Sequence, residues 1–252
     1  MTNIPAEDYH AIKALSKSGL DQLAKSPAHY AHWLQNPDTE PTEAMRIGTA
    51  VHMAVLEPEK FRLKYALFSG DRRTKDGKAA YEALLSTGVE ALNADAWEQI
   101  NGIAASVRSH PWWIENVTDS ETEVSFFDLF DGIDVKARMD GITARHIIDL
   151  KTTSDASPAG FAKSVANFRY HWQAAWYQRF VDLPFVFIAV EKEPPYAVGI
   201  YTLDADAIAI ANADISVLLA NLKDCQAFGS MPGYRSDIVT LSLPKFVKTI
   251  EA

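Results

Sequence analysis

The sequence predicts a mixed α/β domain with one hydrophobic core, in which helices flank a small central mixed β-sheet. Apolar residues recur at helical spacing up to about residue 107, strand-like alternation follows between residues 123 and 151, and helices and strands then alternate to residue 228. The 252 residues, of which 48% are apolar, suffice for a substantial core. We expect a flexible N-terminal arm over residues 1–14 and a single domain over residues 15–252.

Helices dominate the first half of the chain. A Ser18–Asp21 capping box opens the first helix, Pro27 starts the second, Pro58 ends the third and Asp95 caps the last. The first expected helix begins at residue 16. Further helices are expected over residues 27–33, 42–57, 78–85 and 97–107, and loops over residues 36–41 and 72–77.

Strands follow at residues 123–127 and 133–138, and Asp131-Gly132 between them suits a hairpin turn because glycine accepts positive φ. A third strand is expected over residues 146–151. Ser157-Pro158 then opens a helix, and further elements complete the sheet and its cover. These are a helix over 170–181, strands over 184–190 and 198–203, and an apolar helix over about 205–228.

Composition excludes several classes of protein. The 24 Lys and Arg against 33 Asp and Glu give a charge of −9, which argues against a protein coated in basic surface. The single Cys225 excludes disulfide frameworks, four-cysteine zinc sites and iron–sulfur clusters, and fits a reducing setting. No apolar run approaches the ~20 residues that cross a bilayer, and no signal-peptide pattern opens the chain. We expect a cytoplasmic protein without a membrane partner.

Potential chemistry is concentrated between residues 134 and 153. Asp140 ends one predicted strand, and Asp149 and Lys151 share a face of the next. Leu150 between them points into the core, but its backbone carbonyl stays available. Two carboxylates, a carbonyl and an ammonium suit Mg²⁺ or Mn²⁺. A solvated strand with a salt bridge is the commoner reading of D-x-K, but Ile147-Ile148 predicts that Asp149 is buried, where it needs a partner or a metal.

A family resemblance strengthens this interpretation. Asp140, residues 149–153 and residues 173–177 resemble the PD-(D/E)xK nuclease superfamily, in the branch of RecB-type and lambda-type exonucleases. Further motifs resemble the RecE (exonuclease VIII) family of nuclease domains, and the resemblance extends over about residues 15–248. These motifs lie at residues 16–18, 20–21, 24–27, 48–52, 56–59, 168–171 and 240–244.

The resemblance implies a restriction-endonuclease-like core and a metal site. His52, Asp140, Asp149 and the Leu150 carbonyl correspond to the metal ligands, for two Mg²⁺ ions per site with Mn²⁺ as an alternative. Lys151 corresponds to the lysine beside the attacking water, and His52, Asp140, Asp149 and Lys151 together would form the catalytic set.

Three secondary positions complete the expected site. Gln173 and Tyr177 match the family's Q-x-x-x-Y motif and would pack near the active site, although a hydrogen-bonded core pair is an equal alternative. Glu123 opens a strand and could reach a second metal, whereas an exposed strand-end glutamate is the simpler interpretation. Met139 stands where the family has a proline; that proline shapes a turn and provides no ligand.

The family activity is the 5′-to-3′ degradation of one strand of linear double-stranded DNA. It leaves 3′ overhangs for prophage-type recombination by single-strand annealing. The resemblance also implies a homo-oligomeric ring, a tetramer in preference to a trimer, and a RecT-like annealing partner. Two alternatives remain: a nuclease domain that works only within a helicase assembly, and an inactive nuclease-fold DNA-binding module.

Two groups of residues are candidates for binding DNA phosphates. Ser16 and Ser18, with Arg46 or Arg138, could form an anion site for the 5′ phosphate. Arg72 and Arg73 begin the densest basic cluster, which Lys75 and Lys78 complete, and which could equally be a solvated loop. The net charge of −9 is compatible with DNA if only the channel of a ring is basic.

Overall fold

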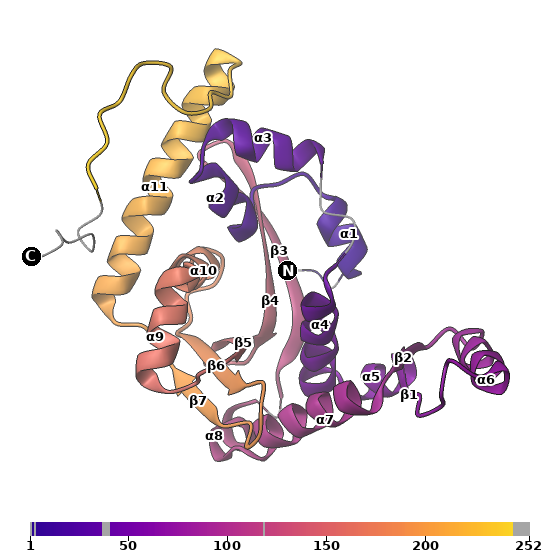
Figure 1. Ribbon diagram of the computed structural model, residues 1–252. Coiled ribbons are helices and arrows are strands. Elements are labelled where there is room, and N and C mark those ends of the chain that lie inside the picture. The colour runs from indigo at the N-terminus through magenta and orange to yellow at the C-terminus, as the bar shows by residue number, and fades with distance from the viewer. Residues whose placement is uncertain (1, 3, 37–40, 118, 244–252) are drawn as a thin grey trace, which may run out of the picture.

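The computed structural model describes residue 2 and residues 4–36, 41–117 and 119–243. Parts of four sequence features lie outside the described residues. They are residues 1 and 3 of the expected arm, residues 37–40 of the expected loop, Pro244 at the end of the last motif, and residues 118 and 244–252 of the expected domain. The predicted mixed α/β architecture is confirmed (Figure 1).

A five-stranded mixed sheet forms the centre of the domain. Its spatial order follows the chain: β3 (Glu121–Phe130), β4 (Ile133–Ile142), β5 (Ile147–Thr153), β6 (Phe185–Glu191) and β7 (Val198–Tyr201). Neighbouring strands are antiparallel except β5 and β6, which are parallel. The crossover between these two contains α9 (Pro158–Asn167) and α10 (Tyr170–Gln178). The β3–β4 hairpin turns at Asp131 and Gly132, both with positive φ, as the sequence predicts.

The sheet separates two hydrophobic clusters because successive residues of a strand face opposite sides. The helices on one side are α10 together with α2 (Lys17–Leu23), α3 (Pro27–Gln35) and α11 (Ala205–Phe228). Those on the other side are α4 (Glu43–Leu56), α5 (Pro58–Lys64), α7 (Ala94–Ser109) and α8 (Pro111–Asn116). Ile147 and Phe187 pack against the first group, whereas Ile148 and Leu150 pack against the second. Strands β5 and β6 are therefore buried on both faces.

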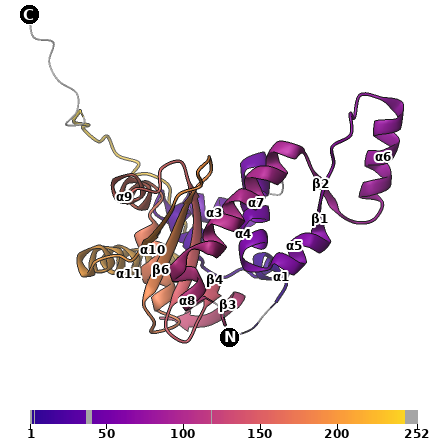
Figure 2. The same cartoon turned by 90° about the horizontal axis from the view of Figure 1, so that it is seen from below.

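A small projection extends from this body. It consists of β1 (Tyr65–Leu67), α6 (Lys75–Leu85) and β2 (Glu90–Leu92), in which the two short strands pair in parallel. Figures 1 and 2 show α6 at its far end, remote from the central sheet.

Several helix starts differ from the sequence prediction. Ser16 caps α2 by accepting a hydrogen bond from the Gly19 amide, so the cap is not Ser18. Asn93, not Asp95, caps α7, and α6 begins inside the expected basic loop. Where several cap-forming residues lie close together, the residue with extended backbone before the first turn becomes the cap.

The segment expected to be a loose arm contains α1 (Ala6–Ala11), with Tyr9 buried. Helices α5 and α8 and strands β1 and β2 are also not among the elements predicted from the sequence. All of these elements are short, and tertiary contacts rather than periodicity decide their conformation.

Helix α11 has the predicted bounds and an apolar composition. By length and composition alone it is long enough to cross a membrane, and it is the one such helix among the described residues. Its buried residues Ala211, Ile215, Leu219 and Leu222 pack into the core beside α10. These contacts account for part of its apolar composition, since 22% of its most apolar 18-residue stretch is buried.

Candidate active site

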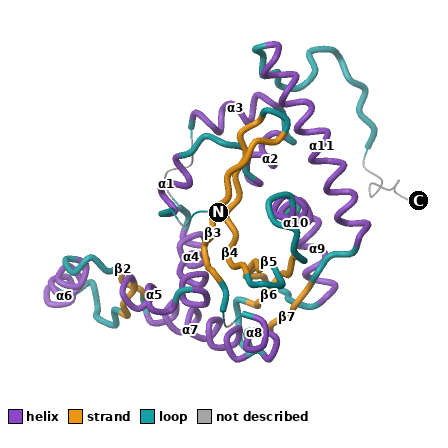
Figure 3. Tube along the Cα trace, turned by 180° about the vertical axis from the view of Figure 1, so that it is seen from behind, coloured by secondary structure: helices purple, strands orange, loops and turns teal. Residues whose placement is uncertain are grey.

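The residues singled out between 134 and 153 converge where β4 and β5 separate. Asp140 comes from β4, Asp149 and Lys151 come from β5, His52 comes from α4, and Gln173 comes from α10. Figure 3 shows these strands running between α4 and α10. The pairing of β4 with β5 covers only Gly141 and Ile142 of β4, which leaves Asp140 beyond the paired region.

His52 and Asp140 form the first half of the site. His52 Nε2 lies 3.2 Å from Asp140 Oδ2, and the Leu150 amide donates a hydrogen bond to the same oxygen at 2.8 Å. His52 Nδ1 lies 2.9 Å from the Gly48 carbonyl, which can only accept, so Nδ1 carries a proton. This contact one helical turn away fixes the ring so that Nε2 faces the carboxylate.

The charges of this pair stabilise each other. Burial alone would lower the pKa of His52, but the charge and hydrogen bond of Asp140 raise this pKa to about 9. Burial alone would raise the pKa of Asp140, and the charges of His52 and Lys151 together with the Leu150 amide lower it instead. In the metal-free protein near neutral pH, His52 is therefore an imidazolium and Asp140 is a carboxylate.

Asp149 and Lys151 form the second half. Asp149 is fully buried, Lys151 Nζ forms an ion pair with its Oδ2, and Gln173 Nε2 donates to its Oδ1 at 2.5 Å. Lys151 Nζ also lies 4.9 Å from the centre of the Tyr170 ring. Burial raises the pKa of Asp149 to about 6, a rise that the Lys151 charge opposes. Burial also opposes the charge on Lys151, but the nearby carboxylates raise its pKa.

The donor atoms suit a hard divalent cation, although they are paired with one another. Two carboxylates, an imidazole and the Leu150 carbonyl are ligands of the types that bind Mg²⁺ or Mn²⁺. Among the described residues, no three His, Cys, Asp or Glu side chains are grouped as a metal cluster. Asp149 Oδ2, buried and held by the ion pair with Lys151, makes no regular hydrogen bond to a described residue. A metal would therefore replace the His52–Asp140 and Lys151–Asp149 pairs.

The secondary candidates lie beside this set. Gln173 contacts Asp149 directly, and the buried Tyr177, one helical turn further along α10, lines the same cavity as Asp140. Glu123 falls opposite Asp140 in the β3–β4 register, because Thr122 pairs with Gly141 and Val124 with Met139. Glu123 has a positive φ of 56°, and its carboxylate is held by Arg138 at 2.7 Å. Burial and the Asp140 charge raise the pKa of Glu123.

The phosphate candidates fall into two groups. Ser16, Ser18 and Arg138 line one cavity of about 710 Å³ together with Asp140. Arg46 is exposed on α4 and is not among the residues that line this cavity.

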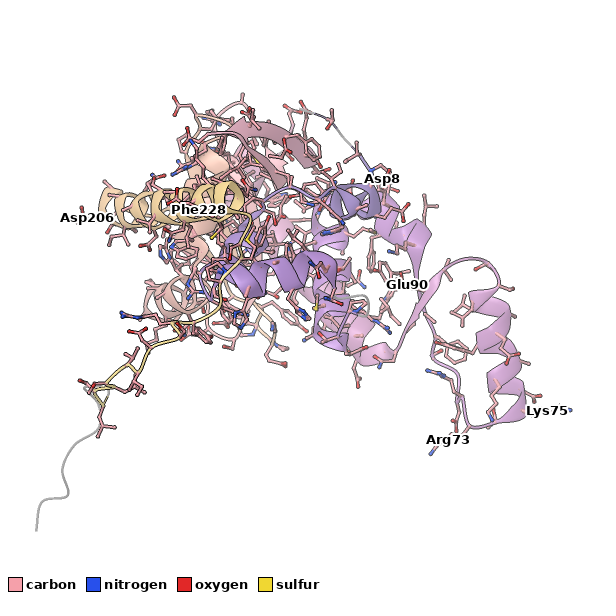
Figure 4. The ribbon with its side chains drawn as sticks, turned by 90° about the horizontal axis from the view of Figure 1, so that it is seen from above. Asp8, Arg73, Lys75, Glu90, Asp206 and Phe228 are labelled. Carbon is pink, nitrogen blue, oxygen red and sulfur yellow. The ribbon has the colours of Figure 1, made fainter. Side chains whose placement is uncertain are left out.

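The basic cluster is not brought to the site. Arg73 and Lys75 lie at the tip of the projection (Figure 4), where Arg73 pairs with Asp71 and Arg72 stacks on Tyr81.

Lys136 and Tyr170 also lie beside this set and are not among the predicted site residues. Lys136 and Arg138 precede Asp140 at intervals of two on β4, so the three side chains share a face. That alternation is the signal that would have identified Lys136. Tyr170 has a weaker signal, since only its place one turn before Gln173 on the same helix marks it.

Residues 16–241 match a family described as "PDDEXK-like domain of unknown function (DUF3799)". No curated protein matches the sequence. The crystal structure of a candidate exonuclease from Eubacterium rectale is similar over 98% of this chain and 97% of its own, with a TM-score of 0.66 and 16% identity. At that identity the similarity establishes the fold alone. The predicted PD-(D/E)xK fold is confirmed.

An alkaline exonuclease from Laribacter hongkongensis is also similar. The similarity covers 66% of this chain and 92% of that one, at 21% identity. The TM-score of 0.33 is too low to support an argument.

The His52–Asp140 pair predicts a pH dependence of stability for the metal-free protein. Because the pair raises the pKa of His52, its contribution is complete below about pH 6.5 and is lost as pH rises through about 9. We expect His52→Asn to lower the free energy of unfolding by up to about 3 kcal/mol at pH 6.5 and by much less at pH 10. Urea unfolding in chelator across this range measures the difference. His32→Asn, which removes an exposed histidine on α3, is the control; a loss in His52→Asn that is equal at both pH values would contradict the assignment.

Proposed function

We propose, from the premise that this chain belongs to the PDDEXK-like domain family matching residues 16–241, that it is a divalent-metal-dependent exodeoxyribonuclease. The observation that carries the proposal is the convergence of Asp140, Lys151, His52 and Gln173, all partly buried, around the fully buried Asp149 in the sheet. A buried carboxylate–lysine pair is costly to stability, and perturbed groups of this kind gather at functional sites.

His52, Asp140, Asp149 and the Leu150 carbonyl would hold the metal. When bound, one or two Mg²⁺ ions would stabilise charge on a phosphate and lower the pKa of a bound water. The protein's own groups would orient the reaction. Lys151, set between Asp149 and the Tyr170 ring, would present its ammonium to the attacking water or to a phosphate oxygen.

Two further contacts would keep this arrangement in place. Gln173 would hold the orientation of the Asp149 carboxylate through the hydrogen bond to Oδ1. The Gly48 carbonyl would keep the His52 ring turned toward Asp140.

The polarity we propose is 5′ to 3′ on one strand of linear duplex DNA, which leaves 3′ overhangs for recombination by single-strand annealing. The family resemblance supports this polarity. The cavity shared by Ser16, Ser18, Arg138 and Asp140 gives it physical support, because hydroxyl and guanidinium groups there could bind a terminal phosphate beside the reacting one.

The proposed setting is a cytoplasmic homo-oligomeric ring, tetrameric rather than trimeric, that acts with a RecT-like annealing protein. A ring would keep the enzyme on DNA over many cycles. A nuclease domain that works only inside a helicase assembly is the second candidate, and an inactive DNA-binding module is a third.

Digestion of end-labelled linear duplex tests the activity. We expect Mg²⁺-dependent loss of the 5′ label before the 3′ label, no digestion in chelator, and at least a 100-fold lower rate for Asp149→Ala and Lys151→Ala. Asp128→Ala, which removes an exposed aspartate near the hairpin turn, is the matched control. Failure to digest, or equal digestion by Asp149→Ala, would overturn the proposal.

The end preference is tested on duplexes with and without a 5′ phosphate. We expect the unmodified enzyme to digest the phosphorylated duplex faster, and Ser18→Ala and Arg138→Ala to reduce that ratio, because each removes a polar group from the cavity. A ratio unchanged in both variants would remove these residues from the proposal.

The oligomeric state is tested by light scattering on the purified protein. A mass of four chains is expected, and three would still support a ring. A monomer that digests DNA only when an ATP-driven partner is added would favour the helicase-assembly alternative.

A further inference from the structure

Residues 4–12, which we term the strap, cross the domain beside the active site and are anchored at both ends to the sheet. On one side, Thr2 and Ser125 of β3 exchange backbone hydrogen bonds, both at 3.0 Å. On the other, the Leu15 amide donates to the Asp134 carbonyl and the Lys136 amide donates to the Leu15 carbonyl, both at 2.8 Å. The strap contains α1, and Tyr9 at its centre is buried.

Two cations of β4 hold the strap through its backbone oxygens. Lys136 Nζ donates to the carbonyls of Tyr9 and Ile12 at 2.7 and 2.6 Å. Arg138 Nη1 donates to the carbonyl of Ile4 at 2.9 Å. Lys136 is 5% exposed, so covering it removes an ammonium from water in exchange for neutral acceptors.

Two cavities beside the active site share the strap as part of their lining. His52 lines a cavity of about 780 Å³, and Asp140 lines the cavity of about 710 Å³. Strap residues line both, and so do Glu123 and Arg138. Lys136, Arg138 and Asp140 share one face of β4 and all line the cavity of about 710 Å³, so they form a row beneath the strap.

We propose that Lys136 and Arg138 form a binding site for the phosphates of the substrate strand, and that the strap occupies this site in the free protein. The inference rests on the proposed nuclease function. A phosphate oxygen is a stronger acceptor for lysine and arginine than a peptide carbonyl, because its charge assists the hydrogen bond. A nucleic-acid strand therefore competes with the strap for the same two cations, and the row delivers the strand to Asp140.

A reversible crosslink tests whether the strap must leave. Thr2→Cys and Ser125→Cys, made together in a Cys225→Ala background, replace a hydrogen-bonded antiparallel pair whose Cα atoms are typically about 5.5 Å apart, within the range of a disulfide. We expect the oxidised protein to bind labelled duplex DNA in chelator at least 10-fold more weakly than the reduced form. A reductant should restore binding and Mg²⁺-dependent digestion together. The Ser125→Cys single variant in the same background, oxidised and reduced in parallel, controls for lost contacts.

The salt dependence of binding separates a phosphate contact from a purely structural clamp. With the strap free, Lys136→Met should reduce the slope of log Kd against log salt by about 1, because one phosphate contact is lost. Equal DNA binding by the oxidised and reduced forms, or an unchanged slope in Lys136→Met, would overturn the inference. DNA binding that depends on the redox state, without digestion, would overturn the nuclease proposal but support the inference about the strap. Digestion that is equal in the oxidised and reduced forms would support the nuclease proposal but overturn the inference about the strap.

Discussion

The site depends on the cost of placing a carboxylate where water does not reach it. Asp149 lies on β5, a strand covered on both faces, and an unpaired charge there would cost several kcal/mol. The fold provides a cation two residues along the same strand and an amide donor from α10. The hydrogen bond from Gln173 on α10 to Asp149 therefore links the position of this helix against the sheet to the charge of Asp149.

The same balance of charge explains why the candidate metal ligands form ion pairs within the site. Each of the two candidate acidic ligands has its own cation, Asp140 with His52 and Asp149 with Lys151. The excess of acidic residues in the whole chain therefore does not describe this region, where Lys136 and Arg138 extend the positive charge along β4. Net charge is a property of the entire surface, whereas ligand binding depends on the local potential.

Much of the fold and part of the site could be predicted from local patterns. Alternation located β3, β4 and β5, the Asp131-Gly132 turn located the hairpin, and α11 has the predicted bounds. Helix α1 could not be found in this way, because the backbone contacts that hold it come from Lys136 and Arg138, more than 120 residues away in the chain. The Gln173–Asp149 contact likewise depends on the crossover that carries α10 back over the sheet, and spacing alone does not predict such contacts.

The parallel pairing of β5 with β6 has a consequence for how the protein folds. The β3–β4 hairpin is local in sequence and carries Asp140, so it can form early. Asp149 and Lys151 reach their final environment only when the chain from residue 154 to residue 184 has folded back and β6 has docked, which requires closure of a long loop. Asp140 therefore lies in a segment of lower contact order than the β5–β6 pair that holds Asp149 and Lys151. The two carboxylates come together only once the crossover that carries α9 and α10 has folded.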